Sequence, residues 1–268
     1  VLKYHEKLII EEVEIFLAPA GHVLGSAQVV MNFAKQIITV SGDYKRQDDP
    51  TCAAFEPIKS DIFITEATFA LPVFKHPNAN TQINLLIKSI QNFPERCHVI
   101  GVYSLGKAQR LIKMLRNNGW HNTIYLHGSL VKICNLYEKF GIDLGDLEPA
   151  TIQDKPEKPH DFYKGKLILA PPSALADRWS RRFPDPILGM ASGWMTVKQR
   201  AKQRGINLPL ILSDHADWNE ILTTIKEVSP KEVWITHGAE EALIYECSKN
   251  NLTAKALSII GYESDTDL

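Results

Sequence analysis

The chain has 268 residues, of which 44% are hydrophobic and 23% charged, a composition typical of a globular protein and not of a disordered one. Its 30 basic residues nearly balance its 31 acidic ones, so any affinity for a polyanion must come from local clusters. The four cysteines lie far apart without C-x-x-C spacing, which excludes a zinc ribbon and a disulfide framework and favours a reducing cytoplasm. No apolar run reaches the roughly 18 residues that cross a bilayer, and the first residues lack the layout of a signal peptide.

The first quarter of the chain is rich in β-branched residues between tight turns. This pattern predicts four short strands, at residues 13–17, 29–33, 37–40 and 62–65.

From Thr81 onward, apolar residues recur at helical spacing and alternate with short apolar runs. This alternation predicts a mostly parallel sheet covered by helices. A polar, proline-containing stretch at 143–161 is expected to be a surface loop. The remaining elements in chain order are a helix after Thr81, strand 99–103, a helix around 108–115, strand 124–126, helix 130–140, strands 166–170, 188–191 and 210–212, helix 219–228, strand 233–235 and helix 240–250.

The first candidate functional residue is His22, in the segment PAGHVLGSAQV between two predicted strands. Glycines at 21 and 25 allow a close approach of the backbone there. A metal ligand on this loop is one interpretation. A glycine-rich hairpin turn with an incidental histidine is the other.

Two acidic residues come directly after predicted strands. Asp43 lies in SGDYKR and Glu66 in ITEATF. A carboxylate that emerges at a strand end can bridge two metal ions, although S-G-D also suits an ordinary Asx turn.

Two further histidines repeat the arrangement, His215 in LILSDHADW and His237 in VWITHGAEE, each between a strand and a helix. Alone, the SDHAD segment can be a polar helix cap. Together with His22, Asp43 and Glu66, however, the set places imidazoles and carboxylates at several strand ends, the layout expected when one sheet edge holds a metal site.

The motifs that carry these residues, together with YSLGKAQR and ASGWM, resemble those of β-CASP metallo-β-lactamase nucleases and occur in the same order. The resemblance spans residues 18–238. The versions TEATFALP, ASGWM and SDHADW most resemble the ligase-associated DNA exonucleases of bacteria. Relatives in this family include the nuclease subunit of messenger-RNA 3′-end processing and Artemis-type repair nucleases.

The resemblance implies two Zn²⁺ ions, with His22 as a ligand of one, Asp43 as the bridge and His237 as a ligand of the other. Such a pair of ions lowers the pKa of a shared water, so that hydroxide is available near neutral pH. His215 would act as the general acid for the departing oxygen, and Glu66 would hold it by a hydrogen bond that favours the imidazolium form.

The resemblance also offers residues for substrate binding. Lys107, in SLGKAQR, and Ser192 with Gly193, in ASGWM, are expected at turns where backbone N–H groups can hold phosphate. Alternatively, Lys107 starts a solvated helix. Trp194 and Trp218 are either core aromatics or base-stacking platforms. We expect local positive charge for nucleic acid from Lys107, Arg110, Arg178, Arg181, Arg182, Lys198, Arg200 and Lys202.

The family motif H-x-H-x-D-H, which supplies most ligands of the first metal, does not occur in the chain. We therefore expect an N-terminally truncated domain, with weak metal affinity and little or no hydrolysis by these residues alone.

The predicted fold class is α/β, an αββα metallo-β-lactamase core at 1–75 and 190–268 with an inserted α/β β-CASP domain at 76–189. The predicted function is zinc-dependent hydrolysis of phosphodiester bonds, by a DNA exonuclease that acts on single-stranded nucleic acid in repair with a DNA ligase and a helicase. The alternatives are an RNA 3′-end processing nuclease, a non-catalytic nucleic-acid-binding scaffold, and a small-molecule hydrolase, which the large insertion disfavours.

Overall fold

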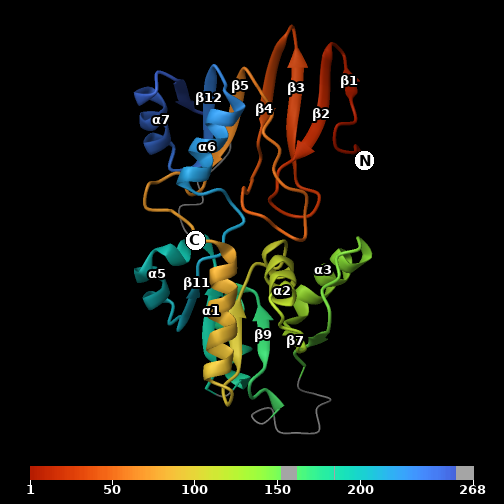
Figure 1. The fold of residues 1–268 in the computed structure, drawn as a ribbon, viewed down its shortest axis with the longest axis vertical. Coiled ribbons are helices and arrows are strands. Elements are labelled where there is room, and N and C mark those ends of the chain that lie inside the picture. The colour runs from red at the N-terminus through yellow and green to blue at the C-terminus, as the bar shows by residue number, and fades with distance from the viewer. Residues whose placement is uncertain (152–161, 184, 258–268) are drawn as a thin grey trace. The chain divides into compact units, whose positions relative to one another are not determined.

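The computed structural model describes residues 1–151, 162–183 and 185–257 (Figure 1). It divides the chain into two compact units. Unit 1 comprises Val1–Asp48, Cys52–Lys75 and His215–Leu268, and unit 2 comprises Asp49–Thr51 and His76–Asp214. None of the helices in the described part of the chain is both long and apolar enough to cross a membrane.

Unit 1 contains one mixed sheet of seven strands in the order β1-β2-β3-β4-β5-β12-β13. The first four strands pair antiparallel, whereas β4, β5, β12 and β13 run parallel. The carboxyl ends of β5 and β12 therefore meet at the same sheet edge. The strands are β1 (Leu8–Ile10), β2 (Val13–Pro19), β3 (Ala27–Phe33), β4 (Gln36–Val40), β5 (Ile62–Ala67), β12 (Glu232–Gly238) and β13 (Thr253–Ala256).

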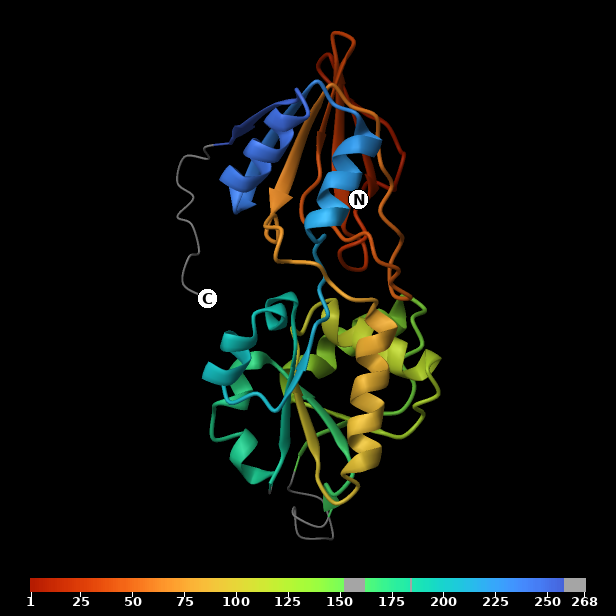
Figure 2. The same cartoon turned by 60° about the vertical axis from the view of Figure 1, so that its left-hand side comes forward.

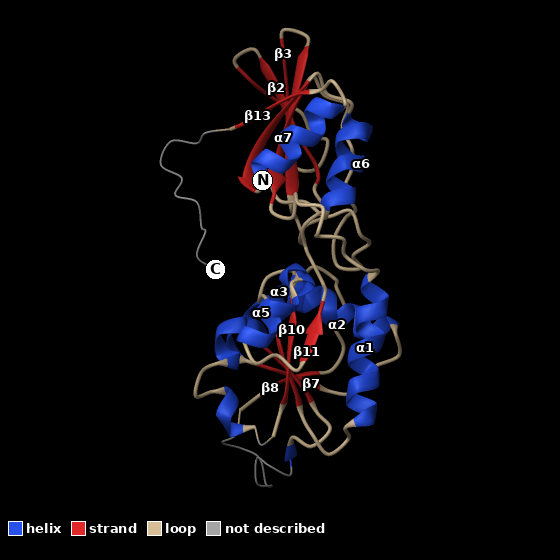
Figure 3. Cartoon of the chain, turned by 90° about the vertical axis from the view of Figure 1, so that its left-hand side faces the viewer, coloured by secondary structure: helices blue, strands red, loops and turns tan. Residues whose placement is uncertain are grey.

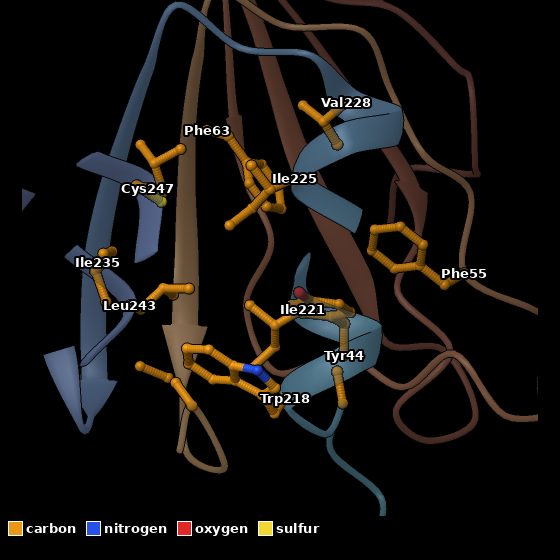
Figure 4. Close-up of a cluster of buried hydrophobic side chains, with 14 of the residues drawn as sticks. Tyr44, Phe55, Phe63, Trp218, Ile221, Ile225, Val228, Ile235, Leu243 and Cys247 are labelled. Atoms are coloured by element: carbon orange, nitrogen blue, oxygen red, sulfur yellow. The ribbon is translucent and has the colours of Figure 1, made fainter. Parts of the chain in front are cut away.

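Helices α6 (Trp218–Val228) and α7 (Glu240–Lys249) cover one face of this sheet (Figure 3). Helix α6 begins with a capping box, in which Asp217 accepts from the Glu220 N–H and the Glu220 side chain accepts from the Asp217 N–H. Its buried stripe packs with Phe63 of β5 and Ile235 of β12 in one apolar cluster (Figure 4). The cluster fixes both strands whose ends carry Glu66 and His237.

Unit 2 contains a parallel sheet of six strands in the order β11-β10-β6-β9-β7-β8. Strand β9 lies between β6 and β7, so the chain returns across the sheet before it continues to β10 and β11. The strands are β6 (His98–Gly101), β7 (Ile124–Leu126), β8 (Leu147–Pro149), β9 (Leu167–Ala170), β10 (Ile187–Ala191) and β11 (Leu208–Leu210).

Helices cover both faces of this sheet, as its nearly continuous apolar strands require. In Figures 2 and 3, α1 and α2 lie on one face and α5 on the other. The α-helices are α1 (Ala79–Asn92), α2 (Lys107–Asn117), α3 (Gly128–Lys139) and α5 (Lys198–Gln203), and the 3₁₀ turns are η1 (Pro172–Leu175), η2 (Ser180–Arg182) and η3 (Gly193–Thr196).

The mixed α/β architecture with two sheets fits the predicted fold class. Of the four αββα layers that we expected in the core, the described residues of unit 1 form one sheet with helices on one face. The division between the units also differs from our boundary at 189/190 and falls at 214/215. The reason is strand pairing, since β10 and β11 extend the sheet of unit 2 next to β6.

Two local expectations need correction. The stretch 143–161, expected to be a loop, contains β8, which pairs with β7; residues 152–161 lie outside the described part. The strand expected at 210–212 ends at Leu210.

Candidate metal centre

Three of the predicted site residues converge in unit 1. His22, Asp43 and His215 each offer one ligand atom, and these atoms all lie within 4.8 Å of one another. The Nε2 atom of His22 lies 3.9 Å from Oδ2 of Asp43, and the rings of His22 and His215 have centroids 4.8 Å apart. Two imidazoles and one carboxylate form a donor set that zinc accepts, so the residues present fit the metal that the motifs imply.

Glu66 orients His215. The Nδ1 atom of His215 lies 2.9 Å from Oε2 and 3.1 Å from Oε1 of Glu66. The side chain of Glu66 is only 2% exposed, whereas that of His215 is 23% exposed. An ionised carboxylate can only accept, so Nδ1 of His215 is the donor and Nε2 is the atom left for a metal or a substrate.

The surroundings of Glu66 keep its carboxylate charged. Burial by itself raises the pKa of Glu66, but the charge of His215 and hydrogen bonds from His215, Thr68 and the Tyr44 N–H outweigh it, so the pKa lies below its ordinary value. The Tyr44 N–H donates to Oε1 over 2.7 Å. Glu66 therefore joins the Asp43–Tyr44 segment to His215.

Each converging residue is close in sequence to a buried residue of the unit 1 core. Ala20 precedes the His22 turn, Tyr44 follows Asp43, and Ala216 follows His215; all three are at most 1% exposed and belong to the apolar cluster. The Ala216 N–H also donates to the Tyr44 carbonyl over 2.7 Å. Core packing and backbone pairing therefore position the three side chains.

Lys45 is a contributor that the sequence did not reveal. Its side chain is buried, and Nζ donates to the His22 carbonyl over 3.1 Å. Gly21 lets the backbone of Lys45 come close to the His22 turn, since it has φ +73° and a Cβ there would lie 2.5 Å from the Lys45 carbonyl oxygen. A lysine in a turn ordinarily predicts an exposed side chain, so only its position two residues after Asp43 could have drawn attention to it.

His237 lies at the same sheet edge as Glu66 but outside the converging group. Strand β12 pairs with β5 through Thr236 opposite Glu66 and Gly238 opposite Ala67, and the register shifts between them, at His237. This bulge gives His237 a φ of +58° and leaves it exposed, with Nδ1 2.9 Å from the Thr236 hydroxyl. Bulges of this kind re-aim a side chain and are common beside active sites. The role of His237 as a ligand of the second zinc stays a prediction.

The residues predicted to bind substrate lie in unit 2 and are buried. Nζ of Lys107 lies 3.3 Å from Oδ2 of Asp214, and the residue is 4% exposed. The Ser192 hydroxyl accepts from the Trp194 N–H at the start of η3, and Gly193 is buried beside it. Their role in phosphate binding stays a prediction, but the charge of Lys107 is balanced within the protein.

The expected basic surface is smaller than predicted. Lys107 and Arg110 are buried in ion pairs, and Arg182 and Arg200 lie over the rings of Trp179 and Trp194. Trp194 is partly buried, and Trp218 belongs to the core of unit 1. Of the eight expected cations, Arg178, Arg181, Lys198 and Lys202 are exposed.

Residues 209–248 match a family model described as the Zn-dependent metallo-hydrolase RNA specificity domain, RMMBL. The matched segment contains both His215 and His237.

Two curated proteins show the wider similarity. The chain is 26% identical over 256 residues to a probable DNA ligase of Opitutus terrae, which covers 91% of this chain and 23% of that protein. It is 33% identical over 142 residues to cleavage and polyadenylation specificity factor 73 of Drosophila melanogaster, which covers 50% of this chain and 21% of that protein. The chain thus spans less than a quarter of the length of either relative.

A solved structure of a protein of unknown function from Enterococcus faecalis V583 matches 97% of this chain and 66% of its own, with a TM-score of 0.62 and 13% identity. At that identity the likeness shows the fold alone. The family model and the relatives support a metal-dependent hydrolase. More specifically, they confirm the predicted resemblance to the β-CASP metallo-β-lactamase nucleases.

Proposed function

We propose that this chain carries part of the zinc site of a nuclease that hydrolyses phosphodiester bonds in nucleic acid, with single-stranded DNA as the preferred substrate. The observation that carries the proposal is the convergence of His22, Asp43 and His215, with His215 held by the buried carboxylate of Glu66. A histidine and a carboxylate suited to zinc, beside a second histidine that a buried carboxylate orients, form the arrangement that metal-assisted hydrolysis needs.

In the proposed site, His22 and Asp43 would hold one zinc, and Asp43 and His237 would hold a second. When bound, zinc lowers the pKa of a water and polarises a phosphoryl oxygen. His215 presents Nε2 to the leaving oxygen and gives it a proton, while Glu66 keeps the ring in position through Nδ1. The Glu66 charge also stabilises the protonated ring.

Exposed cations of unit 2 are suited to hold the phosphate backbone. No acidic residue occurs between Asp185 and Asp214, a stretch that includes the exposed Lys198, Lys202 and Arg204. Local charge of this kind attracts a polyanion even when the net charge of the chain is near zero.

The relatives support two substrates. The name probable DNA ligase supports DNA, and with it an action in repair beside a ligase and a helicase in the cytoplasm. The RNA specificity domain and the polyadenylation factor support RNA as the second candidate. We favour DNA because the similarity to the ligase relative covers 91% of this chain, whereas that to the polyadenylation factor covers 50%.

The test uses these 268 residues and, where the natural protein is longer, its full length. Zinc content is measured first, and then the cleavage of labelled single-stranded DNA and RNA of the same sequence. We expect about two zincs and faster cleavage of DNA by the full-length protein, a loss of at least 100-fold with His215→Ala, and weak zinc binding with little cleavage by the 268 residues. His121→Ala, which removes an exposed imidazole, is the matched control.

Faster cleavage of RNA would overturn the preference for DNA and favour the processing nuclease. Binding of either polymer without zinc and without cleavage would support the non-catalytic scaffold instead. Zinc binding without binding of either polymer would favour a small-molecule hydrolase.

A further inference from the structure

A buried group of four charged side chains lies in unit 2, outside the candidate metal centre. Helix α2 contributes Lys107 and Arg110, one turn apart, and the loop ends contribute Asp49 and Asp214. Nζ of Lys107 lies 3.3 Å from Oδ2 of Asp214, Nη1 of Arg110 lies 3.8 Å from Oδ1 of Asp214, and Nε of Arg110 lies 3.8 Å from Oδ2 of Asp49. None of the four side chains is more than 5% exposed.

The two acids stand where the chain passes between the units. Asp49 is the first residue of the three-residue segment of unit 2 that interrupts unit 1, and Asp214 is the last residue of unit 2 before His215. Arg110 also donates from Nη1 to the Ser213 carbonyl over 2.5 Å. One guanidinium therefore contacts the two residues that lead directly into His215.

Because burying these charges is costly, the four side chains are expected to do more than stabilise the fold, namely to fix the position of the groups they contact. Removing a cation and an anion from water costs several kcal/mol per ion, and apolar side chains of similar size often pack at least as stably. What an arginine adds is direction, because its planar guanidinium fixes several acceptors at once. Here those acceptors include the backbone immediately before His215.

We propose that Arg110, assisted by Lys107, is a positioning residue that fixes the backbone of Ser213 and Asp214 and so orders the segment that presents His215. The inference rests on the proposed role of His215. It assigns to the SLGKAQR motif an ordering function through Asp214.

Arg110→Met in the full chain tests the proposal, with hydrogen–deuterium exchange of residues 212–218 as the measurement. We expect the amide of Ala216, which donates to the Tyr44 carbonyl, to exchange at least tenfold faster. Arg110→Lys keeps the charge beside Asp49 and Asp214 and is expected to restore part of the protection.

Arg116→Met is the matched control. Arg116 lies on the same helix, is 9% exposed, and donates to four backbone carbonyls elsewhere in unit 2, those of Trp120, Asn122, Leu144 and Asp146. We expect this variant to lower the stability of unit 2 and to leave exchange at 212–218 unchanged.

Wild-type exchange at 212–218 in Arg110→Met would overturn the proposal, and so would an equal increase in Arg116→Met, which would mean a general loosening of unit 2. If Arg110→Met does not fold, exchange at 212–218 is measured instead in Lys107→Met and Arg110→Lys and compared with that in Arg116→Met. Exchange is measured without substrate, so a wild-type protein that cuts no nucleic acid would sink the proposed function while exchange still decides this inference.

Discussion

The two units use similar residues at the ends of their strands to different effect. In unit 1, His22, Asp43 and His215 converge and keep part of their surface exposed, with Asp43 at 49% and His215 at 23%. In unit 2, Lys107 and Ser192 follow strand ends in the same way, but they are at most 4% exposed and satisfied by internal partners. Polar side chains after strands therefore stay partly exposed in one unit and are buried with internal partners in the other.

Two histidines make the same contrast. His215 has a buried carboxylate as its partner and an accessible face, whereas His98, at the start of β6, is fully buried and lies 2.8 Å from the Ser89 hydroxyl through Nε2. Burial, and secondarily the charge of Arg96, lowers the pKa of His98 from 6.5 to about 4. The partner and the solvent exposure, and not the residue type, decide whether an imidazole can work as an acid or a ligand.

The largest effect is expected from Gly238→Ala, which tests how closely the ends of β12 and β5 pack in unit 1. Gly238 has φ +139°, and a Cβ there would lie 2.0 Å from the Ala67 carbonyl oxygen. Since backbone atoms must move to admit it, we expect a loss of about 4 kcal/mol in the free energy of unfolding, measured with urea.

Gly25→Ala is the control for this variant. Gly25 also has a positive φ, +80°, but nothing lies within 4 Å of a Cβ there, so we expect a loss of about 1 kcal/mol. Equal losses of stability in the two variants would mean that the backbone of Ala67 can move away from residue 238 at little cost.

The next largest effect is the pH dependence of stability that the buried side chain of His98 in unit 2 causes. In the unfolded chain His98 takes up a proton near pH 6.5, but in the folded chain only near pH 4. Its contribution to stability is therefore complete above pH 6.5 and is lost as the pH falls toward 4, by on the order of 2 kcal/mol. Urea unfolding at pH 7 and pH 4.5 measures this loss, which His98→Asn should remove.

His121→Asn removes an exposed imidazole instead and should leave the pH dependence unchanged. A wild-type loss that persists in His98→Asn would assign the effect to other groups.

The smallest effect is expected from a substitution in α5. It tests whether exposed cations of unit 2 contact nucleic acid. Lys202→Gln should weaken binding of single-stranded DNA two- to threefold, as about one phosphate contact is lost. The slope of log affinity against log salt should fall in magnitude by about 0.7, measured by fluorescence anisotropy. Lys139→Gln, at the exposed end of α3, should change neither quantity; equal changes would indicate unspecific attraction.

The sequence predicted most of the strands and helices that have a regular pattern of apolar residues. The strands that became β4 and β5 were found because their β-branched runs end in turns, and α1 and α6 because their apolar residues recur at helical spacing. Helix α5 was missed since six mostly polar residues show no apolar stripe, and β13 since its four residues are short and mostly exposed.

The convergence of candidate residues could be predicted where the signal is local, and contacts with a distant part of the chain could not. His22, Asp43, Glu66 and His215 each follow a strand, and the structure brings all four together. The burial of Lys107 could not be predicted, because its partner Asp214 is far along the chain. The boundary at 214/215 was missed for the same reason, since no local pattern shows that β10 pairs with β6.

The brief passage of the chain through unit 2 at Asp49–Thr51 restricts how such a protein can be rearranged by recombination. Unit 2 is not one continuous insertion, since the chain crosses between the units at 48/49, 51/52, 75/76 and 214/215. Exchanging residues 76–214 as a single cassette would bring in a new α2 while Asp49, which faces Arg110, stayed behind. A successful exchange must therefore include both pieces, so the short loop and the long insertion are expected to be inherited together.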